Sequence, residues 1–152
     1  MKLRALLSVG AIAAAGMIGA GVAGASSTPT EYFTAMGTSF DEPLTLVGSG
    51  PISATGTDEA VTNHRDNFVF PDGTVVIKHY TTTTKETYDG RTCTGTHSET
   101  GTYVIAKGTG AYAHATGSGR YKVSAVYQGC DRNQPPTSQS IVIQAHGPLT
   151  LG

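Results

Sequence analysis

The sequence has no tryptophan, only two cysteines and no excess of charge of either sign. The lack of Trp argues against a pocket of the avidin or typical lipocalin kind, because such pockets rely on Trp side chains. With 10 Lys and Arg against 11 Asp and Glu, the chain also lacks the basic surplus that attracts nucleic acid or an anionic membrane surface. Neither of these partners is therefore expected.

Helical periodicity is also missing outside the first 25 residues, where no window repeats its apolar residues about every 3.6 positions. Apolar and polar residues instead alternate with a period of two, most clearly from Gly117 to Gln128. This alternation is typical of half-buried strands, so the sequence predicts an all-β protein. A length of 152 residues suits one folded domain.

A long apolar run occurs only at the N-terminus. Residues 1–25 begin with Lys2 and Arg4, continue through Ala, Leu, Ile, Val and Gly, and end in Ala23-Gly24-Ala25. This pattern is typical of a secretory signal peptide with an A-x-A cleavage site. A transmembrane anchor is the alternative, but glycines interrupt the run and no cysteine follows it to carry a lipid. We therefore expect a secreted protein that leaves the membrane after cleavage.

The two cysteines, Cys93 and Cys130, are expected to form a disulfide, because export places them in an oxidising compartment. The chain-entropy model gives a loop of this length a stabilisation of roughly 4 kcal/mol. A reactive thiol pair is the alternative. It lacks the C-x-x-C spacing and the flanking basic cluster that lower a thiol pKa.

Turn residues divide the rest of the chain into short strands. Residues 26–40 are polar and unpatterned, so we expect a loose lead-in there, although Tyr32 and Phe33 could pack on the domain formed by residues 41–152. Pro51 indicates a bend, and the PDG and YDGR sequences, residues 71–73 and 88–91, indicate turns. Strands are predicted at 44–55, 67–70, 74–87, 92–106 (with a possible break at Gly101), 117–128 and 140–151.

Seven or eight such strands fit either a sandwich or a closed barrel. Gly48, Gly50, Gly117 and Gly119 lie inside predicted strands, where a sheet that bends sharply to close makes use of glycine. The prediction is a closed, eight-stranded antiparallel barrel of calycin-like form with one disulfide.

The segment from Gly101 to Tyr121 reads as a strand, a glycine turn and a second strand. Gly108, Gly110 and Ala113 match the G-x-G-x-x-A pattern of a dinucleotide loop, but that loop needs a helix whose N-terminus faces the pyrophosphate. Gly117 would end such a helix early, and no βαβ pattern surrounds it. The segment therefore predicts a backbone turn and no bound cofactor.

This turn resembles the G-T-G-x-[YF]-x-x-A-x-G turn of the allene oxide cyclase and dirigent-type barrels. Its flanks, GPISATGTD, FVFPDGTVVIKH, RTC and AHGPLTL, resemble the actinobacterial secreted branch of that family, in the family's order over about residues 44–151. Lys107 and His114 depart from the usual turn, where glycine is common. The matching positions are Gly108, Thr109, Gly110, Tyr112, Ala115 and Gly117.

The resemblance implies a barrel that can confine a small molecule, and it implies that the matching turn is structural. The glycines would allow a tight backbone turn, and Tyr112 would plug one end of the barrel. We find no residues in this sequence that correspond to the functional side chains of the family. The resemblance therefore implies the family's fold but not its activity.

Motifs for metal or serine chemistry are missing. The five histidines form neither H-x-H nor H-E-x-x-H, so no metal site is predicted. Neither Ser49 nor Ser118 lies in G-x-S-x-G, so no hydrolase triad is indicated. The Thr-rich segment from His79 to Tyr88 is compatible with ice or glycan binding, but we favour an ordinary exposed strand, because Thr is a good strand residue on an exposed face.

Glu99 and Tyr103 are the remaining candidates for catalysis, since they fall on the same face of one predicted strand. Facing the lumen, a buried Glu99 would have a raised pKa and could act as acid or base. The interpretation we favour from sequence places Glu99 in solvent on the outer face, with Tyr103 as a packing aromatic.

These patterns favour a secreted binding protein over an enzyme, with a small apolar or aromatic ligand held in the lumen. One alternative is a dirigent- or cyclase-like enzyme that steers a reactive intermediate. A structural or interaction protein with a filled barrel is the other. No pattern specifies a substrate or an oligomeric state.

Overall fold

The computed structural model describes residues 27–131 and 133–152. The expected signal peptide and its cleavage site lie outside these ranges. Within them, no helix has the length and apolar character needed to span a membrane.

Eight antiparallel strands form a closed barrel in which each strand pairs with its neighbours in sequence and the last pairs with the first, as predicted. The one helical turn in the described ranges is a 3-10 turn, η1 (Gly110–Tyr112). The strands are β1 (Thr30–Gly37), β2 (Leu44–Ser49), β3 (Thr55–Thr62), β4 (Arg65–Phe70), β5 (Gly73–Asp89), β6 (Thr94–Gly108), β7 (Thr116–Gln128) and β8 (Ser138–Thr150).

The loose lead-in expected at 26–40 is wrong, because residues 30–37 form strand β1 and close the barrel between β2 and β8. Its inward positions are Glu31, Phe33 and Ala35, all buried. The acidic Glu31 at the first inward position concealed the alternation.

The strand expected over 44–55 ends at Ser49, and β3 begins after the bend at Pro51. Strand β6 runs through Gly101 without a break.

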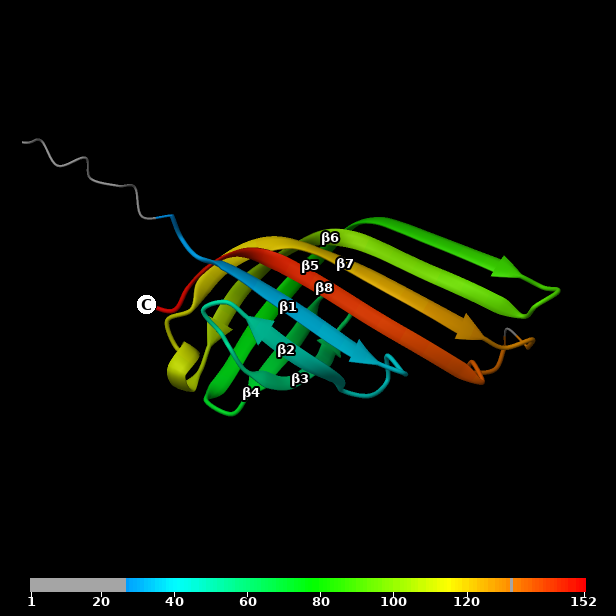
Figure 1. The fold of residues 1–152 in the computed structure, drawn as a ribbon, viewed down its shortest axis with the longest axis horizontal. Helices are drawn as coiled ribbons and strands as arrows, with labels where there is room; N and C mark the ends of the chain where they lie inside the picture. Colours follow the sequence, from blue (N-terminus) through cyan, green and yellow to red (C-terminus); the bar gives the residue numbers. More distant parts are fainter. Residues whose placement is uncertain (1–26, 132) are drawn as a thin grey trace, which may run out of the picture.

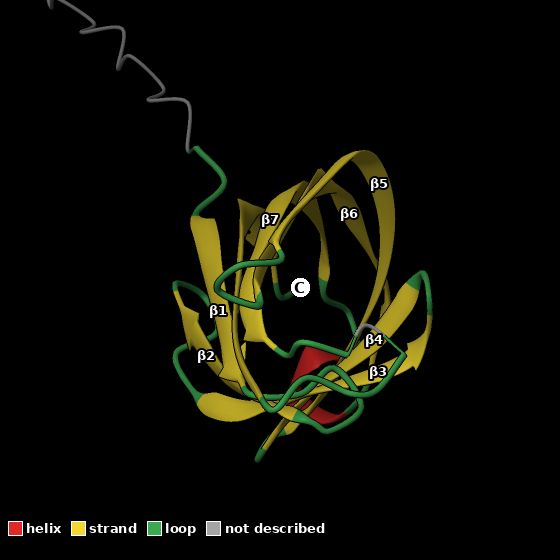
Figure 2. Ribbon diagram, turned by 90° about the vertical axis from the view of Figure 1, so that its right-hand side faces the viewer, coloured by secondary structure: helices red, strands yellow, loops and turns green. Residues whose placement is uncertain are grey.

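Strand lengths differ sharply around the barrel. Strands β5 to β8 have 17, 15, 13 and 13 residues, whereas β2, β3 and β4 have 6, 8 and 6. The long strands therefore project beyond the short ones at one end, as Figure 1 shows. We call this end the open end and the opposite one the closed end. Figure 2 views the barrel from the projecting side.

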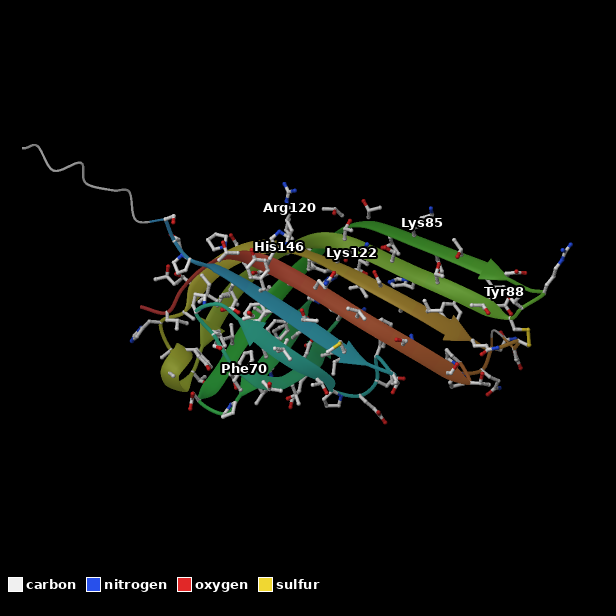
Figure 3. The ribbon with its side chains drawn as sticks, in the orientation of Figure 1. Phe70, Lys85, Tyr88, Arg120, Lys122 and His146 are labelled. Carbon is white, nitrogen blue, oxygen red and sulfur yellow. A yellow bond between two sulfur atoms is a disulfide. The ribbon has the colours of Figure 1, made fainter. Side chains whose placement is uncertain are left out.

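The predicted disulfide is confirmed: Cys93 and Cys130 are bonded with Cα atoms 4.7 Å apart. It lies at the tip of the projection, next to the pairing of Thr94 with Gln128, and it appears as a yellow bond in Figure 3. The bond therefore ties the start of β6 to the end of β7.

Several strand glycines face aromatic rings on the neighbouring strand. A Cβ at Gly101 would lie 2.5 Å from the Tyr121 ring, and one at Gly119 would lie 2.7 Å from the Tyr103 ring. The ring of each tyrosine thus lies over the backbone of its partner strand, which lets the narrow barrel hold large inward side chains.

The glycine turn between β6 and β7 covers the closed end. Tyr112 is buried and packs edge-on against Phe70, with ring centroids 5.8 Å apart. Gly110 has φ +58, and a Cβ there would lie 2.2 Å from the carbonyl oxygen of Asp72. The turn therefore requires glycine at this position. Lys107 and His114 are exposed at this end of the barrel.

Candidate functional site

A cavity of about 510 Å³ lies at the open end, where the short strands stop. Its mouth is bordered by the loop between β1 and β2 and by the turn between β3 and β4. A more open groove continues from it over the projecting sheet and shares Phe40, Asp41, His97 and Glu99 with it. The apolar wall consists of Phe40, Leu44, Ala60, Val61, Phe68, Ile77, Val123, Ile143 and Ala145.

Asp58, on β3, is the most deeply buried acidic group of the cavity, with 6% of its surface exposed. Its Oδ1 atom is buried and has no hydrogen-bond partner among the described residues. Burial raises the pKa of this carboxyl to about 7, and the charge of Asp66 adds to the increase while His79 opposes it. Near neutral pH, Asp58 therefore exchanges between its neutral and charged forms.

His79, on β5, pairs with Asp66 across the β4–β5 ladder, with 3.2 Å between Nε2 and Oδ2. The hydrogen bond to Asp66 raises the pKa of the imidazole, against the lowering caused by burial. The other ring nitrogen, Nδ1, is buried and has no partner in the described part of the chain. The cavity thus contains a second polar atom whose hydrogen bonding is incomplete.

Glu99 lies in the cavity lining, so the favoured interpretation that placed it on the outer face is wrong. The Tyr121 hydroxyl donates to its Oε1 at 2.5 Å, the Thr81 hydroxyl donates to the same atom at 2.7 Å, and His97 lies 3.8 Å from Oε2.

The raised pKa expected for a buried Glu99 is also wrong. Burial alone would raise it, but the hydrogen bonds from Tyr121 and Thr81, with the two nearby histidines, lower it below its ordinary value. Glu99 is therefore held as a carboxylate. Tyr103 lines the same cavity, and burial, followed by the charge of Glu31, raises its pKa to about 12.

The lining is acidic. Among the described residues that line the cavity, none is Lys or Arg. His79 and His97 belong to this lining, His64 packs against His79 near the mouth, and His114 and His146 are exposed elsewhere. No group of three potential ligands is arranged to hold a metal ion within the described ranges. The acidic members are Asp41, Glu42, Asp58, Asp66 and Glu99.

Sequence reasoning missed most of this site. Asp58, Asp66, His79, His97 and Tyr121 come from five different strands, and no linear motif joins them. The available signal was weak: Tyr121 occupies an inward position in the clear alternation of β7. Only Glu99 and Tyr103 were identified, from their shared face on β6.

Comparisons with protein-family models, with curated proteins and with solved structures find no match to this chain. What the structure defines is a small, closed, eight-stranded antiparallel barrel with one disulfide and an acidic cavity at one end. The disulfide indicates an oxidising compartment.

Proposed function

We propose that the protein binds a small, mostly apolar or aromatic molecule in the cavity at the open end. The observation that carries this proposal is the cavity itself: its volume falls within the range of roughly 300–1,000 Å³ typical of small-molecule sites. Its wall combines apolar and aromatic side chains with convergent acidic and histidine groups, and small-molecule sites usually combine an apolar wall with placed polar groups.

The incomplete hydrogen bonding inside the cavity supports the same proposal. Asp58 Oδ1 and His79 Nδ1 are both buried and unpartnered among the described residues. Buried polar atoms that lack partners destabilise the folded protein, and most native structures avoid them. A ligand with a polar end supplies the missing partners while its apolar part contacts Phe68 and Ile77.

We further propose that the chain is exported and is related to the allene oxide cyclase and dirigent-type barrels. The N-terminal sequence pattern and the disulfide support export. The glycine turn, the order of the flanking motifs and the eight-stranded barrel support the relationship.

A second candidate function is catalysis on a molecule confined in the cavity. It is favoured by the two carboxyl groups whose pKa values are shifted in opposite directions, Asp58 upward to about 7 and Glu99 downward. Such a divergence is common where one group transfers a proton and another stabilises charge. Proton NMR of a molecule recovered after binding separates the two functions, because a binding protein returns it unchanged whereas an enzyme returns a product, which can be an isomer of the same mass.

The neutral fluorescent probe N-phenyl-1-naphthylamine tests the binding proposal. We expect saturable fluorescence enhancement with the full secreted chain. Ala60→Trp places an indole at the cavity mouth and should weaken binding about tenfold. The matched control, Ala106→Trp, lies on the exposed outer face of β6 and should leave affinity unchanged.

Each variant carries a single tryptophan, because the natural chain has none. Energy transfer between that indole and the probe should therefore occur in both proteins but be strongest where the indole lies at the mouth. Absence of probe binding by the natural protein, or equal affinity in the two variants, contradicts the proposal.

A further inference from the structure

We propose that the polar end of the ligand is a cation, a protonated amine on an apolar or aromatic body, and that its N–H groups bind Asp58. This inference rests on the proposed binding function and names the chemical class of the ligand.

The distribution of charge between the two faces of the barrel is the first observation. The strand alternation directs the basic residues Lys78, Arg120 and Lys122 to the outer face, where all three are exposed. Figure 3 shows Arg120 projecting away from the ribbon. The cavity receives five acidic residues and, among its described lining, no Lys or Arg. A carboxylate or phosphate ligand would be repelled here, and a cation attracted.

The second observation is which carboxyl groups already have partners. Asp66 is paired with His79, and Glu99 accepts hydrogen bonds from Tyr121 and Thr81. Asp58, more than nine-tenths buried, has an unpartnered Oδ1. An ammonium group is a pure donor, so it can satisfy a bare carboxylate oxygen and neutralise its charge together.

The aromatic lining favours the same class of ligand. Phe40, Phe68, Tyr103 and Tyr121 all line the cavity, and the Tyr121 ring lies 5.5 Å from the His79 ring in an edge-on arrangement. Aromatic faces attract ammonium ions and also pack against an apolar body.

The charge state of Asp58 couples binding to pH. The groups that act on it are Glu59 on its own strand, Asp66 on β4 and His79 on β5, with Glu99 on β6 also in the cavity. Burial raises the pKa of Asp58 to about 7, so below that pH a cation must displace its proton. Loss of the His79 proton at higher pH also removes a positive charge. Both effects make affinity for a cation increase as pH rises.

A matched series of naphthalene derivatives tests the inference by titration calorimetry with the full, disulfide-bonded chain. The probes are 2-naphthylmethylamine, which is cationic, 2-naphthylmethanol, which is neutral, and 2-naphthoate, which is anionic. At about pH 8 we expect the amine to bind about tenfold more tightly than the alcohol, and the naphthoate most weakly.

At about pH 5.5 the amine should bind about tenfold more weakly than at the higher pH, with release of protons visible as a dependence of the heat on the buffer. The alcohol should change by less than about twofold.

Two variants locate the effect. Asp58→Asn should weaken amine binding about tenfold at the higher pH, reduce its pH dependence and leave alcohol binding unchanged. Asp72→Asn makes the same acid-to-amide change in the exposed turn between β4 and β5, at the closed end, and should leave binding of all three probes unchanged. Unchanged alcohol binding by Asp58→Asn also shows that its cavity is intact.

The outcomes separate the two proposals. If the alcohol or the naphthoate binds as tightly as the amine, or if Asp58→Asn binds the amine normally, the cation inference is overturned while the cavity remains a binding site. If neither the three naphthalenes nor N-phenyl-1-naphthylamine binds, both proposals are overturned.

Discussion

Two buried carboxyl groups, Glu31 near the closed end and Asp58 at the open end, differ in their partners. Glu31 is fully buried, and its two oxygens accept hydrogen bonds from the backbone N–H groups of Ser49 and Ile52 at 2.9 and 2.6 Å. Asp58 is almost as deeply buried, but its Oδ1 has no partner among the described residues. The same chemical group thus fastens a loop at one end and keeps an unpartnered oxygen at the other.

The surroundings of the two groups explain this difference. Glu31 lies beside the bend that joins β2 to β3, where free backbone N–H groups need acceptors. Burial raises the pKa of Glu31, and the hydrogen bonds from Ile52, Ser49 and Tyr32 oppose that increase. Asp58, in contrast, lines the cavity and lies near the charged side chains of Asp66, His79 and Glu59. Burial of an acidic residue therefore identifies a candidate site only when its partners are missing.

The largest effect is expected from removing the carboxyl at the closed end. Glu31→Ala leaves the N–H groups of Ser49 and Ile52 without acceptors and should lower the free energy of unfolding by about 4 kcal/mol. Urea denaturation at neutral pH measures it. Glu59→Ala, on an exposed surface, is the control and should change stability little. A loss below about 1 kcal/mol for Glu31→Ala would contradict the structural role of this group.

Removing the disulfide should cause the next largest loss of stability. This bond lies at the tip of the projection beyond the open end. The double variant Cys93→Ala/Cys130→Ala should lose about 3 kcal/mol of stability, because the unfolded chain is no longer constrained; this lies within the roughly 2–4 kcal/mol typical of a disulfide and below the chain-entropy value of roughly 4 kcal/mol. The cavity lies in the barrel and not at the tip of the projection, so the folded variant should still bind the probe. Loss of binding at temperatures where the variant is folded would show that the tip also shapes the cavity.

Asp58→Asn should increase the free energy of unfolding, in contrast to the two losses expected above. Because the folded pKa, about 7, exceeds the ordinary value of 3.8, the folded protein holds a proton that the unfolded chain loses between these pH values. Wild-type stability therefore falls as pH rises through this window, and the asparagine variant escapes that loss. We expect a gain on the order of 3 kcal/mol at about pH 8 and a smaller gain at about pH 5, measured by urea denaturation. A variant less stable than wild type at the higher pH would refute it.

Glu99→Gln should have the smallest effect of the four. Its pKa is lowered in the folded protein, so its carboxylate stabilises the fold above the ordinary pKa, and that contribution disappears as pH falls. Because the group is partly exposed, we expect a loss of about 1 kcal/mol at neutral pH. The difference between variant and wild type should shrink toward about pH 3 in acid denaturation. A constant difference would assign the effect to packing.

The closed end was largely predictable from the sequence. Alternation in β7, the PDG turn before β5 and the glycines inside strands are local signals, and they predicted strands, turns and barrel closure. Strand β1 was missed because Glu31 occupies an inward position that is ordinarily apolar. The reason for that acid, a pair of backbone N–H groups, lies about twenty residues along the chain and cannot be read locally.

The open end was less predictable, because it depends on strand lengths and register. Asp58 meets His79 only through the pairing of β3 with β4 and of β4 with β5. Glu99 points inward because it lies on the same face of the sheet as Tyr103 and, across the pairing of β6 with β7, Tyr121. The sequence of β6 alone does not indicate which of its two faces points inward. Its lowered pKa depends on the hydroxyl groups of two other strands.

The most direct test is a thermal unfolding experiment on wild type and Asp58→Asn at about pH 8, each with and without 2-naphthylmethylamine. Because the buried Asp58 carboxyl lacks a partner for its Oδ1 atom, the variant should unfold at a higher temperature than wild type when neither protein has a ligand bound. The amine should raise the unfolding temperature of wild type much more than that of the variant. A variant that is less stable when free, or that is stabilised by the amine as strongly as wild type, would contradict a ligand-binding role for Asp58.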